Sequence, residues 1–267
     1  MKKSVTVLLL LLVVIFGVVF GFSAYKLYSI MHEYKESEQK YDGVASQVMS
    51  TAAPAPVTSP YAAPSEGETT VPAVQYTEFS PIQVDFDSLL AQCQDIVAWI
   101  YCENTVINYP IVRGQDNDYY LHRFIDGSYN GGGTLFLDFK CNKDFSDPNS
   151  IIYGHHMNDG SMFASISKYR NDGYYAEHPV LYLNTPEQNY RIDVFAAFMT
   201  DADSDTYTIG FPDDASCQRW LDRMAAQSDF QTNVQLSPED HVITLSTCSY
   251  EYYDARYVVL GKLVPIG

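Results

Sequence analysis

The feature that most constrains this chain is a run of apolar and small residues near its N-terminus, residues 5–25, which contains no charged side chain. As a helix, this run spans about 31 Å, which matches the hydrocarbon core of a bilayer. A cleaved signal peptide has a shorter apolar region before its small-residue cleavage site, and Gly21 and Ser23 only imitate such a site. Residues 1–25 are therefore predicted to be a cytoplasmic tip and a transmembrane anchor.

The charges around this run indicate its orientation. Lys2 and Lys3 precede it, and the positive-inside rule places such residues in the cytoplasm, although Lys26 beyond the run reduces the asymmetry. We expect a single-pass protein of the cell membrane with a cytoplasmic N-terminus and an extracellular remainder.

Two segments are expected between the anchor and a folded domain. Residues 26–50 carry apolar side chains at helical spacing, which favours a helical stalk; a coiled coil is the alternative, but fewer than four heptads are present. Residues 51–80 are rich in Pro, Ala, Ser and Thr and are predicted to be a linker, because this composition buries no core. The folded domain is expected at residues 81–267. The apolar positions of the stalk are Leu27, Ile30, Met31 and Tyr34.

The chain is acidic, with 16 Lys and Arg residues against 33 Asp and Glu residues and a formal net charge of -17. A polyanion would be repelled by this charge, so the sequence predicts no nucleic-acid partner. The 5 cysteines show neither C-x-x-C nor C-x-x-H spacing, so neither a metal site nor a complete disulfide framework is predicted. The 22 tyrosines favour an aromatic-rich β domain over a helical bundle.

Short strands dominate the pattern of residues 81–267. Runs such as VINYPIV and HVITLSTC are separated by Gly, Asn, Asp and Pro. A helix is predicted near the start of the domain, where apolar residues recur at helical spacing between residues 86 and 100, and another begins with Asp213 or Asp214 as its N-cap. The predicted fold is mainly β: a closed barrel of about eight strands, with an N-terminal helix and a long helix before the last two strands.

The segment TLSTCSYEYYDAR, residues 244–256, carries two residues with catalytic chemistry. The alternation of side chains along a strand places Ser246 and Cys248 on the same face. Arg256 opens the next β-type run, so the intervening residues can form a loop that returns the guanidinium to the thiol end of the strand. By itself, however, a cysteine is more often a buried apolar residue than a nucleophile, and Arg256 alone is an ordinary surface charge or a partner of Asp254.

A pair of histidines elsewhere in the chain favours a catalytic role for Cys248. The run SIIYGHH ends with Gly154, His155 and His156, and an imidazole titrates in the range needed to assist a thiol. A neighbouring cation favours the thiolate, and a fixed guanidinium can stabilise the oxyanion that forms during acyl transfer. These residue types predict acyl transfer by a cysteine nucleophile.

The motifs TLSTC, Arg256 and YGH resemble those of the sortases, the cysteine transpeptidases of the Gram-positive cell surface. The likeness is greatest to class B and covers most of residues 83–267; a class C enzyme would be expected to carry a second apolar anchor and a lid motif. The resemblance implies that Cys248 is the nucleophile and that His155, in preference to His156, is the general acid and base. It assigns Arg256 to the oxyanion or to substrate positioning, and it implies no cofactor or metal.

The same resemblance implies a set of substrate-binding residues, for which core packing or turn chemistry is the ordinary alternative. They are Asn117, Leu121, Tyr153, Tyr207 and Ser246. Two features depart from the family pattern: AWIYCENT stands where a Pro-Gly turn is usual, and Ser249 stands where an acidic residue is sometimes found. Glu251 is a candidate replacement for that acidic residue.

The predicted activity is a two-step transpeptidation at the outer face of the cell membrane. Cys248 cleaves the C-terminal sorting motif of an exported protein through a thioester, and a peptidoglycan amine then accepts the acyl group. A hydrolytic cysteine protease with the same residues and a non-catalytic surface-binding module are the two alternatives. An L,D-transpeptidase is disfavoured, because its arginine follows the cysteine more closely.

Overall fold

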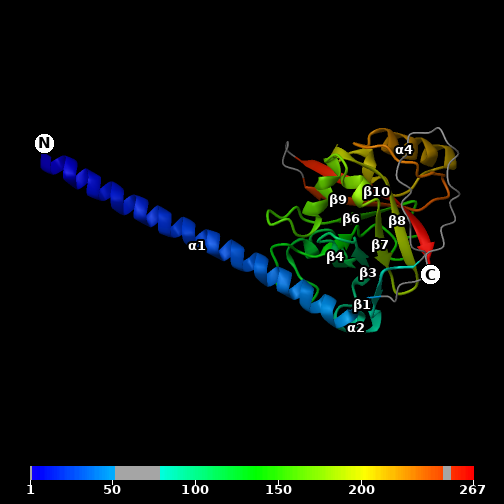
Figure 1. Cartoon of the computed structure of the whole chain (residues 1–267), viewed down its shortest axis with the longest axis horizontal. Helices are drawn as coiled ribbons and strands as arrows, with labels where there is room; N and C mark the ends of the chain where they lie inside the picture. Colours follow the sequence, from blue (N-terminus) through cyan, green and yellow to red (C-terminus); the bar gives the residue numbers. More distant parts are fainter. Residues whose placement is uncertain (1, 52–78, 249–253) are drawn as a thin grey trace.

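The computed structural model describes residues 2–51, 79–248 and 254–267, and its centre is a closed barrel (Figure 1). Neighbouring strands follow the order β10-β8-β7-β3-β4-β5-β6-β9 around the barrel. These strands are β3 (Ile96–Tyr101), β4 (Asn108–Val112), β5 (Leu135–Leu137), β6 (Asn149–Tyr153), β7 (Val180–Asn184), β8 (Asn189–Asp201), β9 (Val242–Cys248) and β10 (Ala255–Ile266). The mainly β fold and the closed eight-stranded barrel predicted from the sequence are confirmed.

The remaining elements surround this barrel. The α-helices are α1 (Lys2–Val48), α2 (Phe86–Gln92), α3 (Tyr174–Glu177) and α4 (Asp214–Ala226). The 3-10 helices are η1 (Tyr119–His122), η2 (Phe163–Arg170) and η3 (Asp205–Tyr207), and two short strands outside the barrel are β1 (Met49–Thr51) and β2 (Ile82–Val84). The predicted linker, residues 51–80, lies almost entirely outside the described residues.

Helix α4 is the long helix that was predicted before the last two strands. Its N-cap is Asp213, whose side chain accepts a hydrogen bond from the Ser216 N–H at 2.7 Å. Trp220 and Met224 are buried on the face that meets apolar side chains of β8 and β10. The capping carboxylate and the apolar stripe, both readable in the sequence, therefore fix where this helix starts and which way it faces.

The helix predicted between residues 86 and 100 is wrong in its second half. Helix α2 ends at Gln92, and Ile96–Tyr101 forms strand β3 between β4 and β7. All but the last residue of β3 are buried, so its apolar run reflects burial on both faces of the barrel wall rather than one helical stripe. The β-branched residues Ile96 and Val97 also favour the strand.

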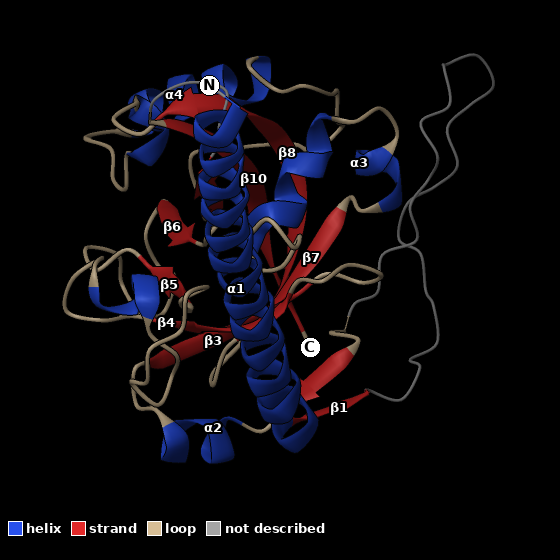
Figure 2. Ribbon diagram, turned by 90° about the vertical axis from the view of Figure 1, so that its left-hand side faces the viewer, coloured by secondary structure: helices blue, strands red, loops and turns tan. Residues whose placement is uncertain are grey.

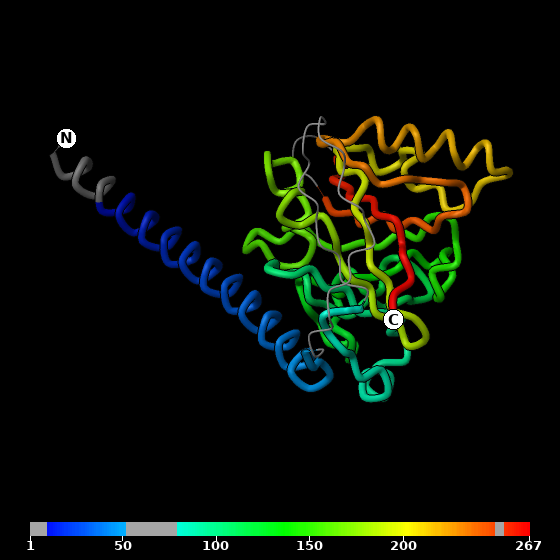
Figure 3. Tube along the Cα trace, turned by 45° about the vertical axis from the view of Figure 1, so that its right-hand side comes forward, coloured from blue at the N-terminus to red at the C-terminus, as the bar shows by residue number. Residues whose placement is uncertain are grey.

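Helix α1 is continuous: its N-terminal part extends away from the barrel and its C-terminal part packs on it (Figures 1 and 3). From Leu10 onward it is long and apolar enough to cross a membrane, by length and composition. Tyr41, Val44 and Val48 belong to the same buried core as the barrel residues. Figure 2 shows this end of α1 beside β1 and α2.

The docked residues of α1 differ from the apolar positions on which the stalk was predicted. Leu27, Ile30 and Met31 are exposed, whereas the buried residues lie about three to five turns farther along the helix. After Val48 the chain enters β1, which pairs with β2 in an antiparallel ladder. Residues 52–78 therefore connect two strands that pair with each other, and the helix is held on the domain by its own contacts.

The pairing of β6 with β9 brings two distant parts of the sequence together. The two strands are parallel, with Tyr153 opposite Ser246 at their C-terminal ends. Just beyond this pair, the Gly154 N–H donates to the Ser246 carbonyl at 3.0 Å, and the Thr247 hydroxyl donates to the Gly154 carbonyl at 2.8 Å. Both chains therefore leave the barrel at the same end and side by side.

Gly154 is required at this junction by close packing. A Cβ atom there would lie 2.4 Å from Leu135 Cδ2 and 2.6 Å from Phe163 Cδ2, whereas one at Gly210 would meet open space. We expect Gly154→Ala to lower the free energy of unfolding by about 1–3 kcal/mol, and Gly210→Ala to change it by less than about 0.5 kcal/mol. Denaturant titration of both variants, followed by tryptophan fluorescence, checks this; equal effects would contradict the packing argument.

Candidate active site

Cys248 is the last residue of β9 and is half-buried, although the two residues before it are almost fully buried. All five cysteines are free thiols. Burial raises the pKa of Cys102 to about 11 and that of Cys141 to about 12, which leaves almost no thiolate at neutral pH. Burial also raises the pKa of Cys217. Cys93 and Cys248 are the two half-buried thiols, and Cys248 is the one at the partly exposed end of a barrel strand.

Arg256 lies directly opposite Cys248, because the two residues are partners in the antiparallel β9–β10 ladder. Side chains of such partners project from the same face of a sheet, with Cβ atoms about 4.5–5.5 Å apart. One guanidinium nitrogen, Nη1, donates to the Ala255 carbonyl at 3.1 Å, and among the described residues Arg256 forms no ion pair. The positive charge is therefore held at the thiol end of β9.

His155 follows Gly154 at the point where β6 is fastened to β9. Tyr153 and Ser246 are register partners, and His155 and Cys248 stand two residues beyond them on their respective chains. The three residues predicted from separate motifs thus converge at one end of the barrel, since β9 is flanked by β6 on one side and β10 on the other. His156, the less favoured candidate, forms an isolated β-bridge with Met162.

The His155 imidazole is held in a defined orientation. Its Nε2 lies 2.7 Å from the Leu121 carbonyl, and because a carbonyl only accepts, Nε2 carries the proton. The ring stacks on His122, with 5.3 Å between ring centroids and an interplanar angle of 18°. Burial lowers the pKa of His155; the hydrogen bond to Leu121 opposes this effect and His122 adds to it. The ring therefore favours the neutral form, in which Nδ1 is the nitrogen that exchanges a proton.

Three of the predicted substrate-binding residues contact one another next to Cys248. The Tyr207 hydroxyl lies 2.9 Å from Ser246 Oγ, and the Tyr153 ring stacks on the Tyr207 ring at 6.1 Å. Burial raises the pKa of Tyr207. The hydrogen bond with Ser246 and the charge of Arg256 lower this pKa, and Cys248 raises it, so the phenol interacts electrostatically with both Arg256 and Cys248. Ser246 is only 1% exposed, whereas Tyr207 is half-buried. Of the two side chains, Tyr207 is therefore the more accessible to a substrate.

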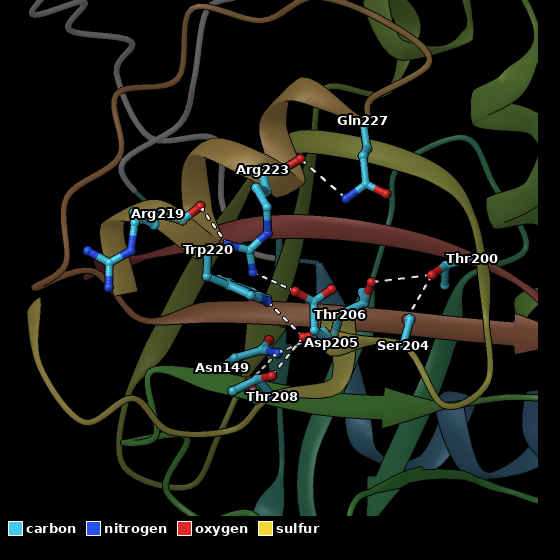
Figure 4. A network of polar contacts seen from close by, with 10 residues as sticks. All are labelled: Asn149, Thr200, Ser204, Asp205, Thr206, Thr208, Arg219, Trp220, Arg223 and Gln227. Atoms are coloured by element: carbon cyan, nitrogen blue, oxygen red, sulfur yellow. Dashed lines mark hydrogen bonds and ion pairs between the residues drawn. The ribbon is translucent and has the colours of Figure 1, made fainter. Parts of the chain in front are cut away.

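The 3-10 helix η3, which ends at Tyr207, is held by a network of hydrogen bonds around Asp205, Thr206 and Thr208 (Figure 4). The Trp220 indole N–H donates to the Asp205 carbonyl at 2.9 Å, and the Asn149 amide donates to the carbonyls of Thr206 and Thr208 at 3.1 and 3.0 Å. These contacts fasten η3 to α4 on one side and to β6 on the other. A short irregular segment therefore presents its tyrosine with little freedom.

Asn117 and Leu121 reach the site in ways that the sequence did not indicate. The Asn117 amide donates to Asp138 Oδ2 at 3.0 Å and accepts from the Phe139 N–H at 3.0 Å, so both of its ends bind the protein. Leu121 contributes its backbone carbonyl to His155, while its side chain packs against the core.

Sequence reasoning did not identify Asp138 or His122. Asp138 is 6% exposed, and its Oδ2 accepts hydrogen bonds from both Asn117 and Tyr153. An acidic residue at the end of the apolar run GTLFLDF was the available signal, because a buried carboxylate needs partners. His122 carried no local signal, since its contact with His155 spans different elements.

The arrangement has the groups that acyl transfer needs. A thiol, an imidazole and a guanidinium lie at one end of a barrel, beside a wall of tyrosines. Within residues 2–51, 79–248 and 254–267, no group of three or more His, Cys, Asp and Glu side chains is arranged to hold a metal ion. The site is that of a thiol-dependent acyl-transfer enzyme.

Comparison with known proteins identifies the family. The model of the sortase domain matches residues 100–264. Sortase B of Listeria monocytogenes is 38% identical over 173 residues, which cover 64% of this chain and 70% of that protein. Sortase B of Staphylococcus aureus is 29% identical over 188 residues, covering 70% and 77%. The chain belongs to the sortase family of cysteine transpeptidases, and within that family to class B.

Solved structures agree with this assignment. Sortase B from B. anthracis in complex with AAEK1 superposes with a TM-score of 0.70 at 28% identity, covering 88% of this chain and 99% of that chain. A Staphylococcus aureus sortase B-substrate complex gives a TM-score of 0.65 at 30% identity, covering 68% and 85%. The barrel described above is therefore the sortase B fold.

The lowered pKa of His155 predicts a pH dependence of stability. A histidine whose pKa is lower in the folded than in the unfolded state stabilises the fold above its unfolded pKa of about 6.5, and this contribution is lost as the pH falls. Between about pH 7 and pH 5 the wild-type protein should lose more free energy of unfolding than His155→Asn. Denaturant titrations of both proteins across this range test the prediction; equal losses would show that burial of His155 is not linked to folding.

Proposed function

We propose that this protein is a membrane-anchored transpeptidase that attaches exported proteins to the cell wall. Its substrate is a C-terminal sorting motif, the acyl acceptor is a peptidoglycan amine, and the apolar part of α1 is the membrane anchor. The observation that carries the proposal is the register of β9. Cys248 has Arg256 as its direct partner in β10, and on the other side of β9 strand β6 ends two residues before His155.

In the first step the Cys248 thiol gives its proton to neutral His155, and the resulting thiolate attacks the carbonyl carbon of the scissile peptide bond. The carbonyl oxygen becomes an oxyanion, which the Arg256 guanidinium stabilises by hydrogen bonding and charge. The intermediate collapses with cleavage of the C–N bond, and the protonated His155 gives its proton to the departing amine. The products are a thioester on Cys248 and the released C-terminal fragment.

In the second step an amine attacks the thioester carbonyl. Neutral His155 accepts a proton from this amine, the C–S bond breaks, and Cys248 leaves as a thiolate. Arg256 again faces the oxyanion. The net result exchanges one amide for another without consuming water. The protein acts as a transferase when an amine attacks the thioester and as a hydrolase when water does.

Loss of the thiol should abolish the reaction. We expect the full-length chain in detergent micelles to cleave a fluorogenic sorting peptide, and Cys248→Ala to reduce kcat/KM by at least about 1,000-fold. Cys93→Ala is the matched control, because Cys93 is also a half-buried free thiol but packs at Tyr120, away from β9. Turnover that persists in Cys248→Ala would refute the assignment of the nucleophile.

An added amine separates transpeptidation from hydrolysis. With an oligoglycine or a stem-peptide amine present, the product should change from the carboxylic acid to the amide, while the release of the C-terminal fragment continues. Mass spectrometry of the N-terminal product distinguishes the two. Exclusive formation of the acid at saturating amine would favour the hydrolytic protease.

The Tyr207 hydroxyl should contribute to substrate binding. Removing it in Tyr207→Phe leaves Ser246 without its partner and takes a hydrogen-bonding group from the wall beside Cys248. A lost hydrogen bond of about 0.5–1.5 kcal/mol corresponds to a rise in KM of about 2- to 10-fold, with a smaller change in kcat. Tyr190→Phe on β8 serves as the control, and steady-state kinetics of the three proteins make the comparison; an unchanged KM would remove Tyr207 from the binding surface.

A further inference from the structure

The docked end of α1 lies against the segment that holds the catalytic imidazole. We propose that Tyr41, on the helix that also carries the membrane anchor, is a positioning residue for His155. The proposal rests on the function given above, because it assigns to His155 the proton transfers of that reaction. Two independent paths of contacts lead from Tyr41 to His155.

The first path reaches the acceptor of the His155 hydrogen bond. The Tyr41 hydroxyl donates to the Gly133 carbonyl and lies 3.3 Å from Thr134 Oγ1. Gly133 is packed directly on Leu121: a Cβ atom added there would lie 2.3 Å from the Leu121 carbonyl oxygen. That oxygen accepts the hydrogen bond from His155 Nε2. The backbones of Gly133 and Leu121 are in direct contact, so a movement of Gly133 displaces the Leu121 carbonyl.

Thr134, the residue after Gly133, reinforces this path. The Thr134 N–H donates to the Tyr120 carbonyl at 3.0 Å, and the Thr134 hydroxyl donates to the Arg123 carbonyl at 2.8 Å. Both acceptors flank Leu121 and His122 in the sequence. Tyr41 thus holds the segment that supplies one hydrogen bond and one stacking partner to the His155 ring.

The second path reaches the backbone of His155. The Tyr41 ring packs edge-on against Tyr109, with ring centroids 5.1 Å apart and an interplanar angle of 85°. The Tyr109 hydroxyl accepts a hydrogen bond from the Met162 N–H at 3.1 Å. The next residue, Phe163, donates its N–H to the His155 carbonyl at 3.0 Å. The hydroxyl of Tyr41 therefore supports the imidazole of His155, and the ring of Tyr41 supports the His155 backbone.

Tyr41 is itself firmly held, as a positioning residue must be. It is 4% exposed, and its ring also packs against Phe124 at 5.0 Å. One residue earlier, Lys40 donates to Ser128 Oγ at 3.0 Å and lies over the Phe124 ring at 5.4 Å. These contacts hold α1 on residues 124–134, in addition to its packing against Tyr109 of the barrel strand β4.

The test compares Tyr41→Phe with Val48→Ala in the full-length chain in detergent micelles. Tyr41→Phe keeps the ring and removes the hydroxyl, so the first path is lost while the helix remains docked. Val48 is buried on the same helix, but its own carbonyl accepts from the Asp85 N–H, at the β1–β2 end. We expect Tyr41→Phe to lower kcat about 3- to 10-fold with KM within about twofold. Val48→Ala should lower thermal stability and leave both constants unchanged.

A second readout needs no substrate. The rate at which iodoacetamide alkylates Cys248 is measured against pH and followed by peptide mapping, which separates Cys248 from the other four thiols. The Leu121 hydrogen bond favours the protonated ring, so a weaker bond should lower the pKa of His155. The part of the alkylation profile that follows the titration of His155 should then move to lower pH. Among the described residues, the other titratable groups at this end are His122, Cys248, Arg256, Tyr207, Tyr153 and Asp138, and all of them are retained in the variant.

The outcomes separate this proposal from the proposed function. A lower kcat and a shifted alkylation limb in Tyr41→Phe alone support the positioning role. Wild-type values in Tyr41→Phe, or the same losses in Val48→Ala, would overturn it. If the wild-type chain turns over no sorting peptide, the transpeptidase proposal fails, and the alkylation profile still decides whether Tyr41 positions His155.

Discussion

The active site depends on one strand pairing, the parallel contact between β6 and β9. Parallel neighbours must be connected by long crossovers, and here the crossover contains β7, β8 and α4. Because the strands run in the same direction, Gly154 and Cys248 emerge at the same end of the barrel. Two cross-strand hydrogen bonds fix this junction: the Gly154 N–H donates to the Ser246 carbonyl, and the Gly154 carbonyl accepts from the Thr247 hydroxyl. A shift of one residue would turn His155 or Cys248 to the opposite face.

Helix α1 and the barrel are parts of one folded unit. Tyr41 and Val44 lie in the same core as barrel residues, although the apolar stretch that precedes them extends free of the domain. The direction of α1 relative to the active site is therefore set by side-chain packing. If α1 spans a membrane as proposed, this packing would hold the active site in a fixed orientation relative to the membrane surface.

Local features of this fold were predictable from the sequence, whereas contacts between elements were not. The alternation in β9 and the Asp213 N-cap depend on neighbouring residues only. In the structure Ile243 and Leu245 pack in the barrel core and Val242 packs in the cluster beneath α4, and Asp213 caps α4. The β3 segment was predicted as helix because a strand buried on both faces shows no alternation. The contacts of Asp138 and Tyr41 are made with partners that lie far away in the sequence. The acidic residue in GTLFLDF was a signal for Asp138 but not for its partners, and no local pattern indicated the role of Tyr41.

The account is tested most directly by disulfide trapping across the β6–β9 junction. His155→Cys and His156→Cys are each prepared in the full-length chain, oxidised with a mild reagent, and mapped for a bond to Cys248. A disulfide forms when Cα atoms lie about 4.4–6.8 Å apart and the Cβ atoms face each other. The parallel register predicts that the thiol introduced at position 155 joins Cys248 and that the one at 156 does not. No bond from position 155, or equal yields from both positions, would contradict the account.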